Sequence, residues 1–337
     1  MGNKSHFFRQ PGGGGDAFIA TFRTTTDNES ITLPYLSNGT YSGTIDWGDG
    51  TIVENSYANR THNYKVAGDY DVTVLGDCVG WDPGNGNGNY IELINIKQWG
   101  NGFKLINGNG SYLAMPNGDI TATDILNLEG ITNASYMFAY DSNLVFNESI
   151  NNWDVSNITN LNHTFRNCNS FNQPLGNWDV SSVTNMVGLF RENKLFNRPL
   201  NSWNVWSVEN LSLCFRQSVY NQSLDNWDVA NVKTMQACFA YAYNFNQDVS
   251  SWDYSGLNTT NSLLQFMQSK SSSNYNSAYY DNLLIKWASD PSEGGLQPNI
   301  IGELDMGSIK YTANGAAARA SILANNKAQT INDGGQI

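Results

Sequence analysis

The stretch Phe171–Asp179, FNQPLGNWD, recurs along the chain with small changes, and it decides which fold we expect. The segment around its tryptophan occurs in four versions along the chain: NNWDVSNITNLNHTF, GNWDVSSVTNMVGLF, NSWNVWSVENLSLCF and DNWDVANVKTMQACF. The spacings are 25, 25, 24 and 25 residues between Trp153, Trp178, Trp203, Trp227 and Trp252. A fixed period in this range indicates a solenoid, in which each unit buries its apolar residues against its neighbours.

The apolar positions within one repeat predict a short strand, a turn and a short helix. The first of them alternate, as on one face of a strand. The later ones are three and four residues apart, as on the buried face of a helix. A serine between the two parts is predicted to be the helix N-cap at Ser156, Ser181 and Ser207. In the second repeat the predicted core set is Leu175, Trp178, Val180, Val183, Met186, Phe190 and Phe196.

The residues on either side of each tryptophan should face away from this core and form a candidate binding surface. Four aspartates and one asparagine would then follow one another at a strand spacing of about 4.8 Å, where like charges repel. Either each carboxylate accepts hydrogen bonds from the amides of the following turn, or the row binds a carbohydrate or a line of cations. We call these ten residues the polar ladder: Asn152, Asp154, Asn177, Asp179, Ser202, Asn204, Asn226, Asp228, Ser251 and Asp253.

A second row, Asn160, Asn185 and Asn210, is expected to bond the backbone within turns. Two of the four cysteines, Cys214 and Cys238, occupy equivalent repeat positions. They are predicted to be small buried core residues, with a disulfide as the alternative. The cysteines lack C-x-x-C spacing and neighbouring histidines, so we expect no zinc site, and we assign no metal-ligating residue.

The composition of the 337-residue chain limits its partners. Its net charge of -12 disfavours nucleic acid and anionic membranes, both of which need a cationic surface. Charged residues make up only 14 %, which suits an extracellular or particle-surface protein rich in β-structure. The N-terminus lacks the apolar core of a signal peptide, and no stretch is long and apolar enough to span a bilayer. We therefore expect no membrane insertion.

Residues 1–15 are predicted to be a flexible arm, because four glycines follow Pro11. Phe7, Phe8 and Arg9 are the candidate anchor, which would dock into a partner; a disordered tail is the alternative. Residues 16–76 alternate apolar and polar positions between glycine-rich turns, as in a small antiparallel sandwich.

Three motifs in this segment resemble the PKD-type immunoglobulin-like domain: Asp46-Trp47-Gly48-Asp49-Gly50-Thr51, His62-x-Tyr64 and Gly68-x-Tyr70-x-Val72. Asp46 and Asp49 should frame a tight turn whose glycines adopt positive φ. We expect these two carboxylates to bond turn amides, with a calcium site as the alternative.

Three further regions complete the predicted domain organisation. Residues 77–125 should be a junction and N-terminal cap, 126–255 the repeats of about 25 residues, and 256–337 a C-terminal cap. Helices are predicted around 280–288 and within 314–326, where they would shield the last apolar layer.

The repeat unit resembles the BspA-like leucine-rich repeat proteins of bacterial surfaces, in the tryptophan-rich variant with FNQ and WDVS motifs. The resemblance covers roughly residues 90–337. It implies a mainly β chain with short helices, namely a PKD-like sandwich followed by a leucine-rich-repeat-type solenoid. Members of that family look like adhesion and interaction proteins, and related repeats occur in phage genomes.

The sequence favours a structural or binding role over catalysis. His6, His62 and His163 are dispersed, so no catalytic triad is indicated. The aspartates are periodic, whereas a glycosidase needs one distinct pair in different environments; a carbohydrate-active enzyme is the least favoured hypothesis. No cofactor is expected.

The missing signal peptide favours a virion component, such as a capsid decoration or a head or tail fibre, displayed on the particle surface. The alternative is an adhesin at the bacterial cell surface. Expected partners are other virion or surface proteins, bound through the arm and the PKD-like domain, and a host surface protein or glycan on the solenoid. Self-association stays open.

Overall fold

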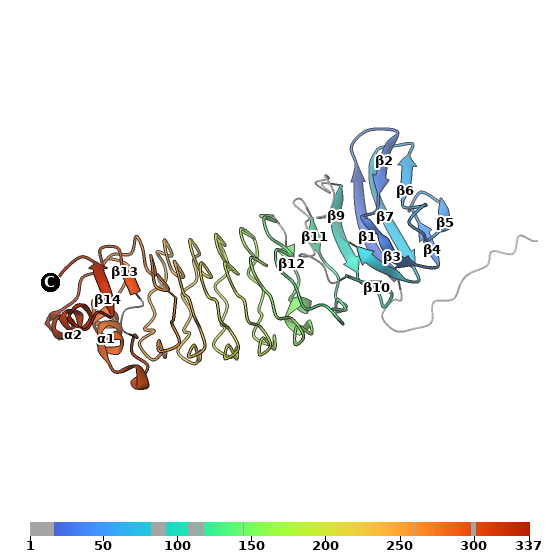
Figure 1. Cartoon of the computed structure of the whole chain (residues 1–337). Helices are drawn as coiled ribbons and strands as arrows, with labels where there is room; N and C mark the ends of the chain where they lie inside the picture. Colours follow the sequence, from blue (N-terminus) through green and yellow to red (C-terminus); the bar gives the residue numbers. More distant parts are fainter. Residues whose placement is uncertain are drawn as a thin grey trace, which may run out of the picture.

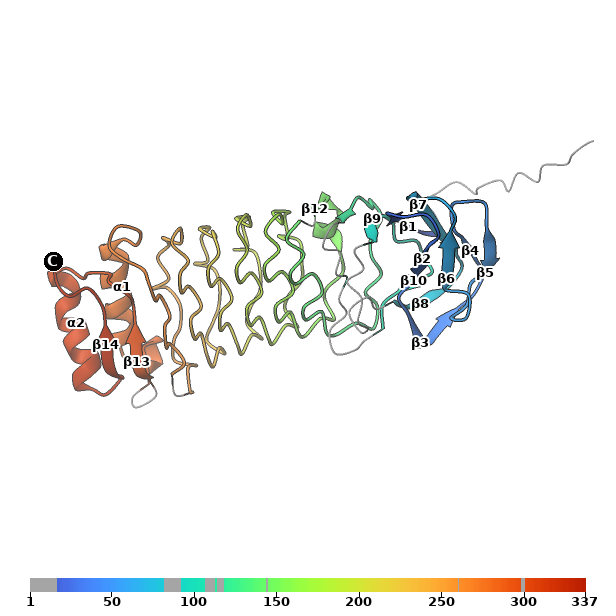
Figure 2. The same cartoon turned by 90° about the horizontal axis from the view of Figure 1, so that it is seen from above.

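The computed structural model describes residues 17–81, 92–106, 113, 118–143, 145–259, 261–297 and 301–337. The candidate anchor Phe7, Phe8 and Arg9 lies outside these residues. The protein is elongated and mainly β: strands gather at one end, a stack of coils follows, and two α-helices lie at the other end (Figures 1 and 2).

The N-terminal end consists of antiparallel strands around an aromatic core. β1 (Ala17–Thr24) pairs along its whole length with β7 (Gly68–Leu75), Ala17 opposite Leu75. Phe18 of β1 contacts the rings of Trp81 and Phe103 at centroid distances of 4.8 and 4.5 Å, so the largest sheet packs against a second, three-stranded sheet. The other strands here are β2 (Glu29–Thr32), β3 (Tyr35–Tyr41), β4 (Thr44–Asp46), β5 (Ile52–Glu54), β6 (Thr61–Tyr64), β8 (Cys78–Trp81) and β10 (Phe103–Lys104).

The turn between β4 and β5 has the predicted conformation. Gly48 and Gly50 adopt φ values of 79° and 94°, which favour glycine. The Asp46 Oδ1 atom accepts the amide of Gly48, and Asp49 Oδ1 accepts the amide of Thr51, both at 2.9 Å. The amide-bonding interpretation of both aspartates is therefore confirmed.

One strand joins this end to the coils. β9 (Leu93–Gln98) pairs antiparallel with β1 on one side and parallel with β11 (Asp119–Ile120) on the other. β11 in turn pairs in parallel with β12 (Val145–Phe146). The seven-stranded sheet thus runs without a break from the N-terminal strands into the first coils (Figure 1).

The predicted short helix in each repeat is wrong. Along Asn185–Asn193 the amides alternate between two kinds of partner. Met186, Gly188 and Phe190 donate to carbonyls of the next coil at 2.9–3.0 Å, whereas Leu189 and Arg191 donate to the carbonyl three residues earlier. The segment is therefore a chain of consecutive tight turns that also bonds to its neighbour. A helix would bond its amides, after the first four, to carbonyls of the same segment, and could not donate every second amide to the next coil.

These turns require left-handed residues at two positions in each coil. Non-glycine residues pay a steric cost of about 1–2 kcal/mol there, which the inter-coil hydrogen bonds must offset. The φ values are between 52° and 71° at Tyr136, His163, Gly188, Leu213 and Ala237, and at Tyr140, Asn167, Glu192, Gln217 and Tyr241.

The segment around each tryptophan is not a strand. Trp178 and Val183 instead donate their amides to the carbonyls of Leu175 and Val180, three residues back. Backbone bridges between coils occur later, in the row Asn133, Asn160, Asn185, Asn210 and Thr234. Here the turns place alternate apolar residues in the core, although no neighbouring strand is hydrogen-bonded to this segment. The alternation was therefore wrongly interpreted as a strand.

The predicted core set is buried throughout, with relative exposures of 0–5 %. Each coil stacks its rings on the next: Trp178 lies 6.4 Å from Trp203 with nearly parallel planes, and Phe165 lies 5.8 Å from Phe190. Cys214 and Cys238 are buried and form no disulfide, and the same is true of Cys78 and Cys168. Their interpretation as buried core residues is confirmed.

Two α-helices close the far end, near the predicted positions: α1 (Ser277–Ala288) and α2 (Ala313–Ala324). β13 (Ile301–Asp305) and β14 (Ala328–Asn332) flank α2 and pair in parallel. Lys270 is buried, and its ammonium group donates to the carbonyls of Ala242, Tyr243, Phe245 and Asn274. This lysine therefore ties the end of the last coil to carbonyls of the coil before it.

Candidate binding face

The polar ladder is exposed along the array, except that Asp253 is half-buried. The acid positions have a clear internal role. Asp154, Asp179 and Asp228 each accept, through Oδ1, the amide two residues later, at 3.1, 3.0 and 3.2 Å. Asn204 and Asp253 do the same with Trp206 and Ser255. The turn-bonding interpretation of the acid positions is therefore confirmed, and the side chain that caps the turn need not be charged.

The hydrogen bonds of these turns also set the ionisation of two ladder acids. Donation from the hydroxyl and amide of Ser156 holds the pKa of Asp154 below its usual value, and Ser181 does the same for the pKa of Asp179. Asp179 lies near enough to Asp154 to oppose the first shift. Both acids are thus anionic at neutral pH, and the predicted N-cap Ser181 instead donates to Asp179.

The side chains directly before the tryptophans make fewer hydrogen bonds within the protein than the acid positions do. Asn226 makes no side-chain hydrogen bond within the described residues, and the Asn177 amide group only reaches Asn152 Oδ1 at 3.4 Å. Ser202 Oγ donates to the carbonyl of Gly176 at 3.0 Å. The amide groups of Asn152, Asn177 and Asn226 are therefore the ladder groups with most capacity to bond a partner.

Trp206 is a site residue that the sequence reasoning missed. Its equivalents in the other coils are Ser156, Ser181, Ala230 and Ser255, because in each case the amide donates to the ladder residue two positions earlier. Ser207 is therefore not the equivalent serine. The Trp206 side chain is 50 % exposed, beside neutral Asn204 in the middle of the ladder. The sequence offered a signal for it, because this repeat reads WNVWS where the others begin WDVS, WDVA or WDYS.

Two hollows lie at the ends of the ladder. The N-terminal one, of about 400 Å³, is lined by Asn151, the ladder residue Asn152, and Pro174, together with Thr123, Asn147, Glu148 and Ser149. Several of these residues belong to a short 3-10 helix, Glu148–Asn152. Asn151 also accepts the amide of Asn177 through Oδ1 at 3.1 Å, which ties the hollow to the second coil.

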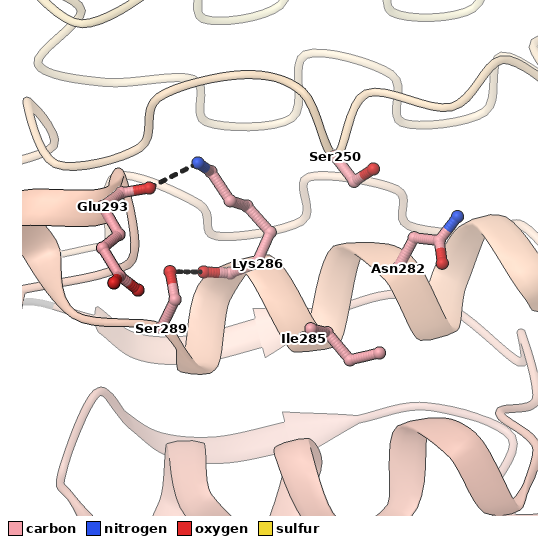
Figure 3. A pocket seen from close by; sticks show the side chains of 6 residues that line it. All are labelled: Ser250, Asn282, Ile285, Lys286, Ser289 and Glu293. Carbon is pink, nitrogen blue, oxygen red and sulfur yellow. Dashed lines mark hydrogen bonds between the residues drawn. The ribbon is translucent and has the colours of Figure 1, made fainter.

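The C-terminal hollow, of about 410 Å³, lies between α1 and the last coil (Figure 3). Asn282, Ile285, Lys286 and Ser289 come from or follow α1, Ser250 precedes the ladder residue Ser251, and Glu293 belongs to the 3-10 helix Pro291–Glu293. The Lys286 ammonium donates to the Glu293 carbonyl at 2.6 Å and leaves two donors for other acceptors.

The second asparagine row has the expected structural role. Asn160, Asn185 and Asn210 each accept, through Oδ1, the amide two residues later at 2.9–3.0 Å. They also form the parallel bridges between coils. This row therefore builds the array and does not belong to the candidate site.

The ladder, Trp206 and the two hollows form a long, open face with amide, hydroxyl and carboxylate groups and one exposed indole ring. Across the described ranges no group of three or more histidine, cysteine or acidic side chains is placed to hold a metal ion. Within the same ranges neither α-helix is long and apolar enough to cross a bilayer. Such a face can bind an extended polar ligand through hydrogen bonds and ring stacking.

Comparison with known proteins gives one match. The family model described as "Mycoplasma protein of unknown function, DUF285" matches residues 113–219 and 206–282, which together span half of the chain. No curated protein and no solved structure matches significantly. The matched residues contain the coils, the polar ladder and the first half of α1.

Proposed function

The chain belongs to the family described as Mycoplasma protein of unknown function, DUF285, and on this premise we propose that it is a non-enzymatic, surface-displayed binding protein. The observation that carries the proposal is the polar ladder, an exposed face on which the amide groups of Asn152, Asn177 and Asn226 keep capacity to bond a partner and the Trp206 residue is half exposed. In this proposal the array is a BspA-like, leucine-rich-repeat-type solenoid, and the N-terminal sheets are a PKD-like, immunoglobulin-like domain that attaches it to its particle or cell.

The ligand that suits this face is a glycan of the host surface. Sugars offer hydroxyl groups to amide and carboxylate groups, and their apolar ring faces can lie against an exposed aromatic side chain. Binding would be shallow and spread over several coils, as the two hollows of about 400 and 410 Å³ at the ladder's ends indicate.

A glycan array with the purified chain tests this proposal. We expect binding to a restricted set of neutral glycans and a loss of at least about fivefold in affinity for Trp206→Ser, since stacking on an aromatic ring contributes about 1 kcal/mol or more. This variant restores the serine of the other repeats and should fold normally. Tyr243→Ser, which removes an aromatic side chain of similar exposure outside the ladder, is the matched control. Equal binding by all three proteins would contradict the proposal.

The place of display has two candidates. A virion component, such as a capsid decoration or a fibre, is the first, and an adhesin at the bacterial cell surface is the second. The family's description from Mycoplasma favours the second. Mass spectrometry of purified particles and of peptides released by protease from intact cells distinguishes them, because the chain should be found in one of the two fractions.

A further inference from the structure

Positive charge is concentrated on a different face of the array, about half a coil beyond the ladder. Arg166, Arg191 and Arg216 directly follow the stacked rings of Phe165, Phe190 and Phe215 in three successive coils. We call these three residues the arginine file. Neighbouring coils are hydrogen-bonded here, so the three backbone positions repeat at a strand-like spacing of about 4.8 Å.

The arginine file has too few internal partners for its charge. Glu192 is the one acid that pairs with it in the described part of the chain, at 2.9 Å from Arg191 and 3.7 Å from Arg166. The Arg216 side chain makes no hydrogen bond there, and the buried Nε atoms of Arg166 and Arg216 have no acceptor. The three guanidinium groups therefore have one paired carboxylate among them, although the whole chain carries a net charge of -12.

The polar ladder shows that this imbalance is unusual for the array. Its aspartates are also a row of like charges, but each of the three that flank Trp153, Trp178 and Trp227 accepts a turn amide. The arginines cap no turn, and no comparable structural task accounts for Arg216. A half-buried guanidinium group without an acceptor carries a desolvation cost, which an external anion would remove.

Aromatic rings bound the file at both ends. The Arg166 guanidinium lies 4.9 Å from the centre of the Tyr140 ring, and that of Arg216 lies 5.5 Å from the centre of the Tyr241 ring. Tyr140 is about half exposed. Burial, followed by the charges of Arg166 and Arg191, lowers the pKa of His163, which agrees with a positive potential at this face.

We propose that the arginine file binds a linear acidic polysaccharide, with the sulfate or carboxylate groups of successive sugar units paired to successive arginines. A guanidinium group offers parallel donors that match either oxyanion. The flanking tyrosine rings suit the apolar faces of sugars. An extended acidic peptide fits less well, because its same-face side chains are about 6.7 Å apart, twice the rise per residue. The inference goes beyond the proposed function, since it concerns another face and another class of ligand.

The test uses the full chain and defined probes in calorimetric titrations: a heparin-derived oligosaccharide for sulfate, an oligogalacturonate, which has a carboxylate on every sugar unit, for carboxylate, and a neutral dextran oligosaccharide. We expect one or both acidic probes to bind and dextran not to bind. The affinity should fall as salt rises, because ionic contacts are screened. Which acidic probe binds more tightly identifies the oxyanion.

Three variants locate the binding. Arg216→Gln should weaken it about tenfold, because one charge-assisted contact is lost. Glu192→Gln should strengthen it, since the competing carboxylate is gone, and a merely destabilised protein could not show this gain. Lys233→Gln, which removes a positive charge elsewhere on the array, should leave it unchanged. Trp206→Ser should also leave it unchanged, which separates this site from the ladder.

Several outcomes would overturn the proposal. These are no binding of either acidic oligosaccharide, equal losses for Arg216→Gln and Lys233→Gln, or weaker binding after Glu192→Gln. Tighter binding of a poly-glutamate peptide than of both oligosaccharides would assign the file to an acidic protein partner instead. Thermal melts of all variants confirm that differences in affinity do not come from unfolding.

Discussion

Each repeat tryptophan from the second onward does two things at once. Trp178 is 5 % exposed and stacks on its neighbour Trp203, and its indole Nε1 donates to the Ile150 carbonyl of the preceding coil at 2.7 Å. The same bond recurs from Trp203 to Leu175, from Trp227 to Leu200 and from Trp252 to Leu224, at 2.8–2.9 Å. The position needs both an apolar ring for stacking and an N–H donor for the carbonyl of the preceding coil. Phenylalanine supplies only the ring.

Trp178→Ala should therefore lower the free energy of unfolding by roughly 3–5 kcal/mol, as other large-to-small core changes do. Trp178→Phe should cost less, about 1–3 kcal/mol, because it mainly leaves the Ile150 carbonyl without its donor. Chemical denaturation followed by circular dichroism measures both. A Trp178→Ala protein that melts at the wild-type temperature would show that the tryptophans are not core residues.

The ladder aspartates allow a second prediction about single residues. Asp179→Asn should be nearly neutral at pH 7, because Asn204 caps the equivalent turn in the next coil at 3.2 Å. Asp179→Ala should cost about 1 kcal/mol, as the loss of other amide-capping side chains does. Denaturant titrations of the two variants give the difference, and equal losses would mean that the turn bond contributes nothing.

The lowered pKa of Asp179 predicts how the stability of the protein responds to acid. The folded-state pKa of Asp179 is held below its ordinary value of 3.8. Its ionised form therefore contributes stability that is complete above that ordinary value and is lost as the pH falls through the lowered one. Wild type should lose stability in this acid range more steeply than Asp179→Asn does.

Local elements are decided by contacts between coils. Gly188 has φ of 59°, and a Cβ atom there would lie 2.1 Å from Nδ1 of His163 in the preceding coil. The His163 ring is held over this glycine by a contact of 2.9 Å between Nδ1 and the Val187 carbonyl. The other coils carry tyrosine, histidine, leucine and alanine at this left-handed position. Glycine is needed in this coil because of the histidine, and the turn alone does not demand it.

Gly188→Ala should destabilise the protein by about 1–3 kcal/mol, the usual cost of overpacking. His163→Ala in the same chain should recover part of that loss, because the methyl group then has space. A double-mutant cycle measures this coupling. Additive losses would show that the left-handed backbone conformation, and not the histidine, is the cause.

At the scale of the whole molecule, the array is a sum of similar coils with special ends. β9 covers the first coils, and Lys270 with the two C-terminal helices covers the last. Stability in such arrays is approximately the sum of unit and nearest-neighbour contributions. One coil should therefore be removable if the columns of stacked side chains stay in register.

Deletion of residues 176–200, one period of 25, joins Leu175 to Asn201 and keeps the tryptophan, asparagine and phenylalanine columns aligned. We expect a folded, monodisperse and less stable protein. Deletion of residues 176–187, about half a period, should abolish folding, because it places polar residues in the core columns. Circular dichroism and size-exclusion chromatography compare the two; equal behaviour would contradict the register requirement.

The sequence by itself determined the period, the burial of the core set and the position of the ladder, because side-chain volume and spacing are local properties that repeat. The turn around Gly48 and both C-terminal helices were predictable for the same reason. Only the tertiary structure decided how the backbone is bonded. Residues three and four apart fit a helix and a chain of turns equally well, and the next coil, with acceptors for every second amide, selects the turns.

The candidate sites divide in the same way. The ladder could be located from the repeat, but its aspartates proved to bond turn amides. The unusual tryptophan at position 206 could also be seen in the repeat, whereas its exposure beside the ladder is known only from the structure. The arginine file depends still more on the fold. Its members are 25 residues apart in sequence. Whether an arginine has a carboxylate partner depends on which side chains the neighbouring coils place beside it, and only the stacked structure shows this.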